Sequence, residues 1–122
     1  NTSIILCDYK ASWDMVSSIP NGYYNLKSIL DTIMAIKDSK SKIFITGLSQ
    51  GALIAGELLS ISRYMDIISG VALLGHPGIS PHHVTSAKIL EINHSEDPTT
   101  YNYSGNSVKI VHSISNLFKY HI

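Results

Sequence analysis

The stretch KIFITGLSQGALIAGELL, residues Lys42–Leu59, decides the fold that the sequence predicts. It begins with an apolar run over Ile43–Thr46, which is typical of a buried β-strand. The pattern Gly-x-Ser-x-Gly follows at Gly47–Gly51, and a segment rich in small and helix-forming residues comes next. A strand that turns sharply into a helix at a serine can lift that hydroxyl toward a substrate. Ser49 is therefore either a nucleophile or only a small residue in a tight turn.

Small residues on both sides of Ser49 favour the first interpretation. In a sharp turn, Gly47 and Gly51 are predicted to stand where a Cβ would collide with the adjacent backbone. A helix predicted over Ala52–Tyr64 would aim its first N–H groups and its positive end at the hydroxyl. The backbone N–H of Gln50 is then the expected donor to an oxyanion. A phosphate-binding glycine loop is disfavoured, because the lysine and the spacing of a nucleotide loop are absent.

The rest of the chain alternates between strand and helix patterns, which predicts an α/β fold with a parallel sheet covered on both faces. One helix is predicted around the apolar stripe that runs from Leu26 to Met34, and residues 113–122 are a further helix candidate. Residues 8–22 mix aromatic residues with turn formers and are predicted to form a long surface loop. Besides Ile43–Thr46, strands are predicted at Ile4–Cys7, Val71–Leu74, Lys88–Ile92 and, shorter, at Val108–Val111.

Composition argues against several classes of function. Hydrophobic residues make up 44% of the 122 residues and charged residues 15%, which is typical of one globular domain over residues 1–122. Nine basic and nine acidic residues cancel, and no basic stripe appears, so nucleic acid is not an expected partner. No apolar run reaches membrane-spanning length, and no signal peptide is present. The start at Asn1 rather than Met favours a trimmed chain or part of a longer one.

Neither a cofactor nor a metal is predicted. The single cysteine, Cys7, excludes an intramolecular disulfide within this sequence, and its apolar surroundings favour a small buried residue over a reactive thiol. His82 and His83 are adjacent, and adjacent histidines are poor chelators unless a third ligand converges on them. A surface position is the better prediction for both.

An acid and a base follow Ser49 in the chain order that serine hydrolases of this topology use. Asp97 lies in NHSEDPTT, the loop that follows the predicted strand Lys88–Ile92, at the edge where the sites of open parallel sheets gather. Glu96 is the alternative acid, and a turn residue is the alternative role for Asp97. His112 is the one histidine that lies both after the acid and at the end of a predicted strand.

Other histidines are weaker candidates for the base. His94 precedes the acid by three residues, and His121 is too close to the end of the sequence to be held firmly. His76, in LLGHPG, ends a strand at the same edge of the sheet and is predicted to line the site. The other residues predicted to contact substrate are Tyr9 and Trp13, with Met15 and Ile79 as further candidates.

Together these residues predict acyl transfer. His112 would take the proton from Ser49 as its oxygen attacks an ester carbonyl, and Asp97 would orient the imidazole. The N–H of Gln50, with one further donor, would bind the oxyanion, and water would then release the acyl group. A thioesterase or an acyltransferase could use the same triad, and a catalytically degenerate fold could serve as a binding module.

The segments GLSQGALIAGELL (47–59) and ISGVALLGHPG (68–78) resemble the cutinase family of serine esterases. Members of that family carry a Gly-x-Ser-Gln-Gly-Ala elbow, followed by a similar strand and turn. AKILEINHSEDPTT (87–100) is similar to the strand and aspartate loop of the family. IILCDYKASW (4–13) resembles especially the related phage lysin B esterases, which cut lipid esters of mycobacterial envelopes.

The resemblance implies a three-layer α/β/α sandwich of the α/β-hydrolase type and a small-molecule or lipid ester as substrate. It also implies a secreted or phage-lysin-type protein. The chain departs from the family in two ways. Cutinases usually carry a disulfide beside the acid, where this chain has Thr99 and Thr100. In addition, the family has an earlier strand whose loop supplies the second oxyanion donor. That strand is not visible here, and backbone groups of Lys10–Trp13 are the candidate substitutes.

Overall fold

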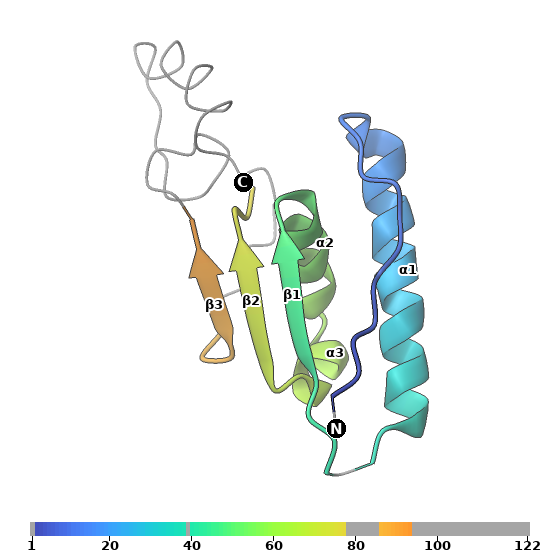
Figure 1. The fold of residues 1–122 in the computed structure, drawn as a ribbon, viewed down its shortest axis with the longest axis vertical. Helices are drawn as coiled ribbons and strands as arrows, with labels where there is room; N and C mark the ends of the chain where they lie inside the picture. The colour runs from blue at the N-terminus through green and yellow to red at the C-terminus, as the bar shows by residue number, and fades with distance from the viewer. Residues whose placement is uncertain (1, 39, 78–85, 94–122) are drawn as a thin grey trace. The chain divides into compact units, whose positions relative to one another are not determined.

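The structure of the protein is a computed structural model that describes residues 2–38, 40–77 and 86–93 (Figure 1). The chain divides into two compact units, Asn1–Ser41 and Lys42–Ile122, which are described separately below. The first unit contains α1, and the second contains β1, α2, α3, β2 and β3 in that order.

Helix α1 spans Met15–Ile36, so the predicted loop over residues 8–22 is wrong in its second half. Asp14 starts the helix: its carboxylate accepts a hydrogen bond from the Ser17 hydroxyl at 2.8 Å, and its carbonyl accepts one from the Ser18 N–H at 3.1 Å. Pro20 lies inside the helix. Proline gives up one hydrogen bond there, but its ring already holds φ near the helical value. The turn-forming residues of this segment therefore led to a wrong prediction of a loop where the backbone is helical.

The predicted strand Ile4–Cys7 is also wrong. These residues are assigned to no strand, and the N-terminal segment of this unit runs beside α1 (Figure 1). The Asn25 side-chain amide donates to the Asp8 carbonyl at 2.7 Å, which fixes the segment to the helix. Ile4 is 92% exposed, so this segment neither pairs as a strand nor buries this side chain.

Cys7 is half-buried, and its thiol lies 3.8 Å from the Gly22 carbonyl oxygen. Burial raises the pKa of the Cys7 thiol above its ordinary value, and the neighbouring Asp8 carboxylate raises it further. Because the thiolate is the reactive form, this environment favours the predicted unreactive cysteine.

We expect Cys7 to react with iodoacetamide at pH 7.5 more slowly in the folded protein than in the same protein unfolded in urea. The raised pKa leaves less thiolate in the folded state, which slows the reaction there. The difference between the folded and unfolded rates should become smaller as the pH rises well above the ordinary thiol pKa, because both states then hold mostly thiolate. Mass spectrometry of the alkylated chain gives both rates. Equal rates at pH 7.5 would contradict the assignment.

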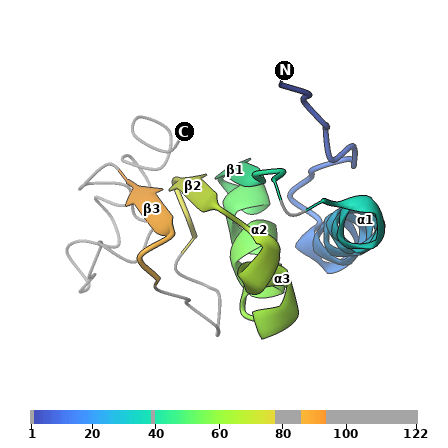
Figure 2. The ribbon, with the colours of Figure 1, turned by 90° about the horizontal axis from the view of Figure 1, so that it is seen from below.

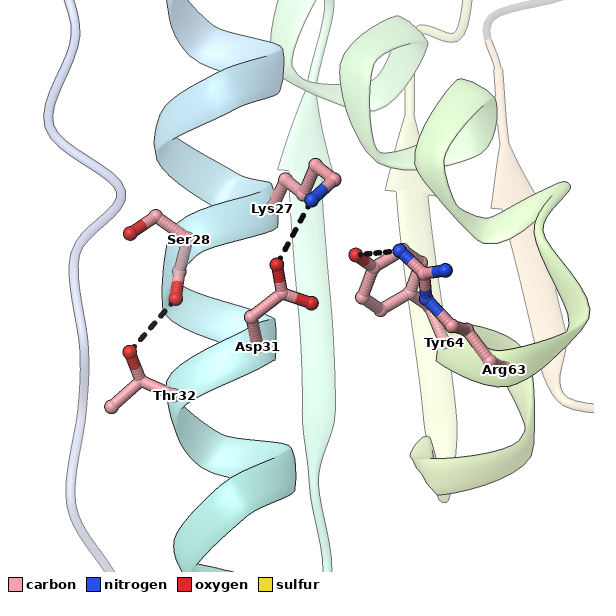
Figure 3. A network of polar contacts seen from close by, with 6 residues as sticks. All are labelled: Lys27, Ser28, Asp31, Thr32, Arg63 and Tyr64. Carbon is pink, nitrogen blue, oxygen red and sulfur yellow. Dashed lines mark hydrogen bonds and ion pairs between the residues drawn. The ribbon is translucent and has the colours of Figure 1, made fainter.

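Polar contacts line the exposed surface of α1. Lys27 forms an ion pair with Asp31 at 3.0 Å, and the Thr32 hydroxyl donates to the Ser28 carbonyl at 2.9 Å (Figure 3). Exposed pairs of this i, i+4 kind contribute only about 0.3–0.5 kcal/mol each. The helix ends at Ile36, two residues after the end of the predicted apolar stripe at Met34.

The second unit is built on a parallel sheet of order β1-β2-β3. Three predicted strands are confirmed closely: β1 is Phe44–Leu48, β2 is Gly70–Leu74, and β3 is Ile89–Ile92. The strand predicted at Val108–Val111 and the helix candidate at residues 113–122 lie outside the described residues. In the register, Leu48 stands opposite Leu74, and Leu74 opposite Ile92. All three strands therefore end at the same edge of the sheet.

The predicted helix Ala52–Tyr64 is two helices in the structure, α2 over Gln50–Leu59 and α3 over Ser62–Ile67. The break follows Ser60, whose hydroxyl donates to the Glu57 carbonyl at 2.6 Å. A serine hydroxyl that bonds the preceding turn competes with the helical ladder, which favours an end there. Tyr64 of α3 is fully buried, and its hydroxyl accepts a hydrogen bond from Arg63 at 2.8 Å (Figure 3).

Helix α2 packs against β1 and β2, and α2 and α3 lie on the same face of the sheet (Figure 2). The core lies between them: Val71 and Leu73 of β2 are buried, as are most residues of α2. In the described part of this unit no helix covers the opposite face, so the predicted coverage of both faces is shown only for one. What is shown is a small parallel α/β unit.

The sequence shows no apolar run of membrane-spanning length. Among the described helices, none is both long and apolar enough to cross a bilayer.

Candidate active site

Ser49 is the single residue between β1 and α2, and its backbone is strained. Its backbone has φ 53° and ψ −115°, and it is the one non-glycine residue with positive φ among those that the structure describes. The Ser49 N–H donates to the Leu74 carbonyl at 2.8 Å, which extends the β1–β2 ladder, and its carbonyl accepts from the Leu53 N–H at 3.1 Å inside α2. The chain therefore changes from strand to helix at one residue, at a cost of about 1–3 kcal/mol.

Gly47 makes this sharp turn possible. A Cβ at Gly47 would lie 2.7 Å from the Gly51 carbonyl oxygen and 2.9 Å from the Ala52 Cα, so the start of α2 lies directly over β1. The predicted collision is confirmed at Gly47. The same prediction is wrong for Gly51, because a Cβ there would meet no atom of the described residues within 4 Å beyond its own helix. Gly51 lies on a side of the turn that is open in the structure.

Gln50 is the first residue of α2 and stands next to the strained serine. N–H groups of a first helical turn project from the end of the helix, and the helix dipole places roughly half a positive charge there. The arrangement therefore provides the electrostatic setting in which an oxyanion beside Ser49 would be stabilised. The role of the Gln50 N–H as an oxyanion donor stays a prediction.

The strand ends next to Ser49 are tied together by further hydrogen bonds. The Gly75 N–H donates to the Ile92 carbonyl at 2.9 Å, and Gly75 has φ 61°, which glycine adopts without strain. The His76 N–H donates to the Asn93 side-chain oxygen at 3.0 Å. This role of Asn93 was not predicted from the sequence. The position of Asn93 directly after the predicted strand Lys88–Ile92 is the feature that could have indicated it.

His76 follows β2 at the predicted edge, but its side chain is only 1% exposed. A Cβ on Gly56 would lie 2.8 Å from the His76 Nε2, so the imidazole packs against the middle of α2. This burial does not favour the predicted contact between His76 and substrate. It instead makes His76 part of the packing between α2 and the sheet.

We expect the effect of Gly56→Ala on stability to change sign with residue 76. In the natural chain the added methyl overlaps His76 and should lower the free energy of unfolding by about 1–3 kcal/mol. In a His76→Ala background the overlap is gone, and alanine should stabilise the helix by up to about 1 kcal/mol. Urea unfolding of the four proteins measures this coupling. Equal effects in both backgrounds would contradict the packing.

Several predicted site residues lie where their relation to Ser49 is not described. Asp97 and His112 lie outside the described residues, so their roles stay predictions. The same holds for the other candidates in residues 78–85 and 94–122, which are Ile79, His82, His83, His94, Glu96 and His121. Tyr9, Trp13 and Met15 belong to the first unit, as do the backbone groups of Lys10–Trp13, and these assignments also stay predictions.

The described part of the chain brings together a strained serine, a helix N-terminus and the carboxyl ends of three parallel strands. Within that part, no group of three or more His, Cys, Asp or Glu side chains could hold a metal ion. A scan of the sequence against protein-family models, a search of curated proteins and a search of solved structures found no match.

Proposed function

We propose that the protein is a serine carboxylester hydrolase in which Ser49 is the nucleophile. The observation that carries this proposal is the positive φ of Ser49 at the junction of β1 and α2. A turn with a purely structural role could carry glycine at this position without strain. A serine there costs free energy, and such strain is found preferentially at functional sites, where it aims a side chain.

The proposed mechanism begins with attack by the Ser49 oxygen on the carbonyl carbon of an ester. His112 accepts the hydroxyl proton and then gives it to the departing alcohol, while Asp97 keeps the imidazole oriented. The N–H of Gln50 and the positive end of α2 stabilise the oxyanion of the tetrahedral intermediate. Water, activated by the same histidine, hydrolyses the acyl-enzyme and regenerates Ser49.

The finer fold assignment belongs to the same proposal. In this proposal, the parallel β1-β2-β3 sheet and α2 form two layers of an α/β/α sandwich. The resemblance of residues 47–59 and 68–78 to the cutinase family supports an α/β-hydrolase fold, and it supports a small or lipid ester as the substrate.

A panel of acyl donors tests this function. We expect the full chain to hydrolyse p-nitrophenyl esters of two to eight acyl carbons faster than it hydrolyses the matching acyl-CoA thioesters, with Ser49→Ala as the blank. Faster cleavage of the thioesters would replace the esterase with a thioesterase that uses the same serine. Equal rates for the natural chain and Ser49→Ala on all donors would reject the hydrolase and favour a binding module.

A further inference from the structure

The pairing between β2 and β3 continues beyond the last residues of both strands. The Gly75 N–H, just past the end of β2 at Leu74, donates to the carbonyl of Ile92 at 2.9 Å. The next contact is made by a side chain, because the His76 N–H donates to the side-chain oxygen of Asn93 at 3.0 Å. Asn93 therefore adds a side-chain hydrogen bond to the edge of the sheet at which Ser49 lies.

One peptide group links this edge to Ser49. The carbonyl of Leu74 and the N–H of Gly75 belong to the same planar group, so neither can turn without the other. That carbonyl accepts the Ser49 N–H at 2.8 Å, and that N–H is held by the Ile92 carbonyl. A rotation of this plane would therefore break a hydrogen bond that holds the Ser49 backbone to the end of β2.

Gly75 is the point at which such a rotation is easiest. Its φ is 61°, and glycine has the widest choice of backbone angles. The residue after it is held from two directions, since Asn93 accepts the His76 N–H and the His76 imidazole packs against α2 at Gly56. Because His76 is buried, loss of an acceptor for its N–H is costly. The Asn93 contact thus fixes the backbone on the far side of Gly75.

We infer that Asn93 is a positioning residue for Ser49, acting through His76 and the peptide group before Gly75. With the Asn93 oxygen in place, rotation at Gly75 is limited and the Leu74 carbonyl stays aligned with the Ser49 N–H. The effect on catalysis rests on the proposed function. A small displacement of the Ser49 backbone moves the attacking oxygen and slows the chemical step, so the loss should appear in kcat and not in KM.

Amide hydrogen exchange tests the link without any catalytic readout. Asn93→Ala in the full chain removes the acceptor, so the N–H groups of His76 and Ser49 should exchange at least about tenfold faster in NMR spectra. Asn93→Asp keeps an accepting oxygen at the same place along the side chain and should leave both rates within about threefold of those of the natural chain. The Val71 N–H, which donates to the Lys88 carbonyl at 2.8 Å, reports global unfolding. The rise at Ser49 should exceed any rise at Val71.

Ser86→Ala is the matched control, because the Ser86 hydroxyl accepts the Lys88 N–H at 3.1 Å at the opposite end of β3. It removes a contact of the same kind away from Ser49, and it should change neither the Ser49 exchange rate nor kcat. With p-nitrophenyl butyrate, Asn93→Ala should lower kcat on the order of tenfold at nearly unchanged KM. Asn93→Asp should keep most of kcat. If Asn93→Ala does not fold, Asn93→Ser, whose oxygen is one bond closer to the backbone, replaces it under the same criteria.

Three results would overturn the inference. The Ser49 N–H could exchange no faster in Asn93→Ala than global unfolding explains, Asn93→Asp could behave like Asn93→Ala, or Ser86→Ala could have the same effects. The function fails separately. If the natural chain has no ester turnover, the hydrolase is rejected and the exchange rates still decide the link. If the natural chain turns over and Asn93→Ala keeps its kcat, the hydrolase stands and the positioning role of Asn93 is rejected.

Discussion

Ser49→Ala should lower the rate of ester hydrolysis by a factor on the order of 10⁶, the loss found when the serine of a catalytic triad is removed. The substitution deletes the attacking oxygen and leaves the backbone conformation as strained as before, since alanine also has a Cβ. The free energy of unfolding should therefore change little. Turnover of p-nitrophenyl butyrate and urea unfolding measure the two quantities on the same preparation.

Ser49→Gly separates the strain from the chemistry. Glycine adopts φ 53° without the steric cost, so this variant should be as inactive as Ser49→Ala but more stable than it by about 1 kcal/mol. The gain is smaller than the full strain because glycine loses more conformational entropy on folding. If Ser49→Gly is less stable than Ser49→Ala, then the turn is not strained in the way that the structure shows.

Gly47→Ala should have the largest effect of any substitution around the turn that leaves Ser49 itself intact. Its Cβ would overlap the Gly51 carbonyl group and the Ala52 Cα, which are backbone atoms that can move only with the whole start of α2. We expect a loss of about 2–3 kcal/mol in the free energy of unfolding. We also expect a loss of about 10²-fold or more in ester turnover, since a shift of about 1 Å misplaces Ser49 and the Gln50 N–H.

Gly51→Ala is the matched control, since the two glycines stand two residues to either side of Ser49. Its Cβ meets no atom within 4 Å in the described part of the chain outside its own helix, and alanine is favoured over glycine in a helix by up to about 1 kcal/mol. The variant should fold at least as stably as the natural chain. If Gly51→Ala is as damaging to stability as Gly47→Ala, then α2 does not start over β1 as described.

The sequence predicted the strand–turn–helix around Ser49 because each local signal agrees there. An apolar run of strand length, a glycine that a close backbone contact requires and a helix of small residues all indicate one arrangement. The two glycines looked equivalent in the motif. Only the direction of each Cβ distinguishes Gly47 from Gly51, and that direction depends on how α2 crosses β1.

The first unit was harder to predict. Ile4–Cys7 has the composition of a buried strand, but strand formation depends on a partner that local sequence does not reveal. Pro20 and Gly22 suggested a loop, yet both lie within α1. Gly22 is buried in α1, and its carbonyl oxygen lies 3.8 Å from the Cys7 thiol. Around the candidate site, the strand–turn–helix at Ser49 was predicted, although α2 begins at Gln50 and not at Ala52. His76 follows β2 as predicted, but its burial was not predicted.

The central claim is that Ser49 is an activated nucleophile, and a fluorophosphonate probe tests it most directly because such probes react with serine only where a base and an oxyanion site activate it. The full, folded chain should gain the mass of one probe, peptide mapping should locate that mass on Ser49, and prior unfolding should abolish the reaction. A folded chain that takes no label, or that is labelled at another residue, would contradict the account.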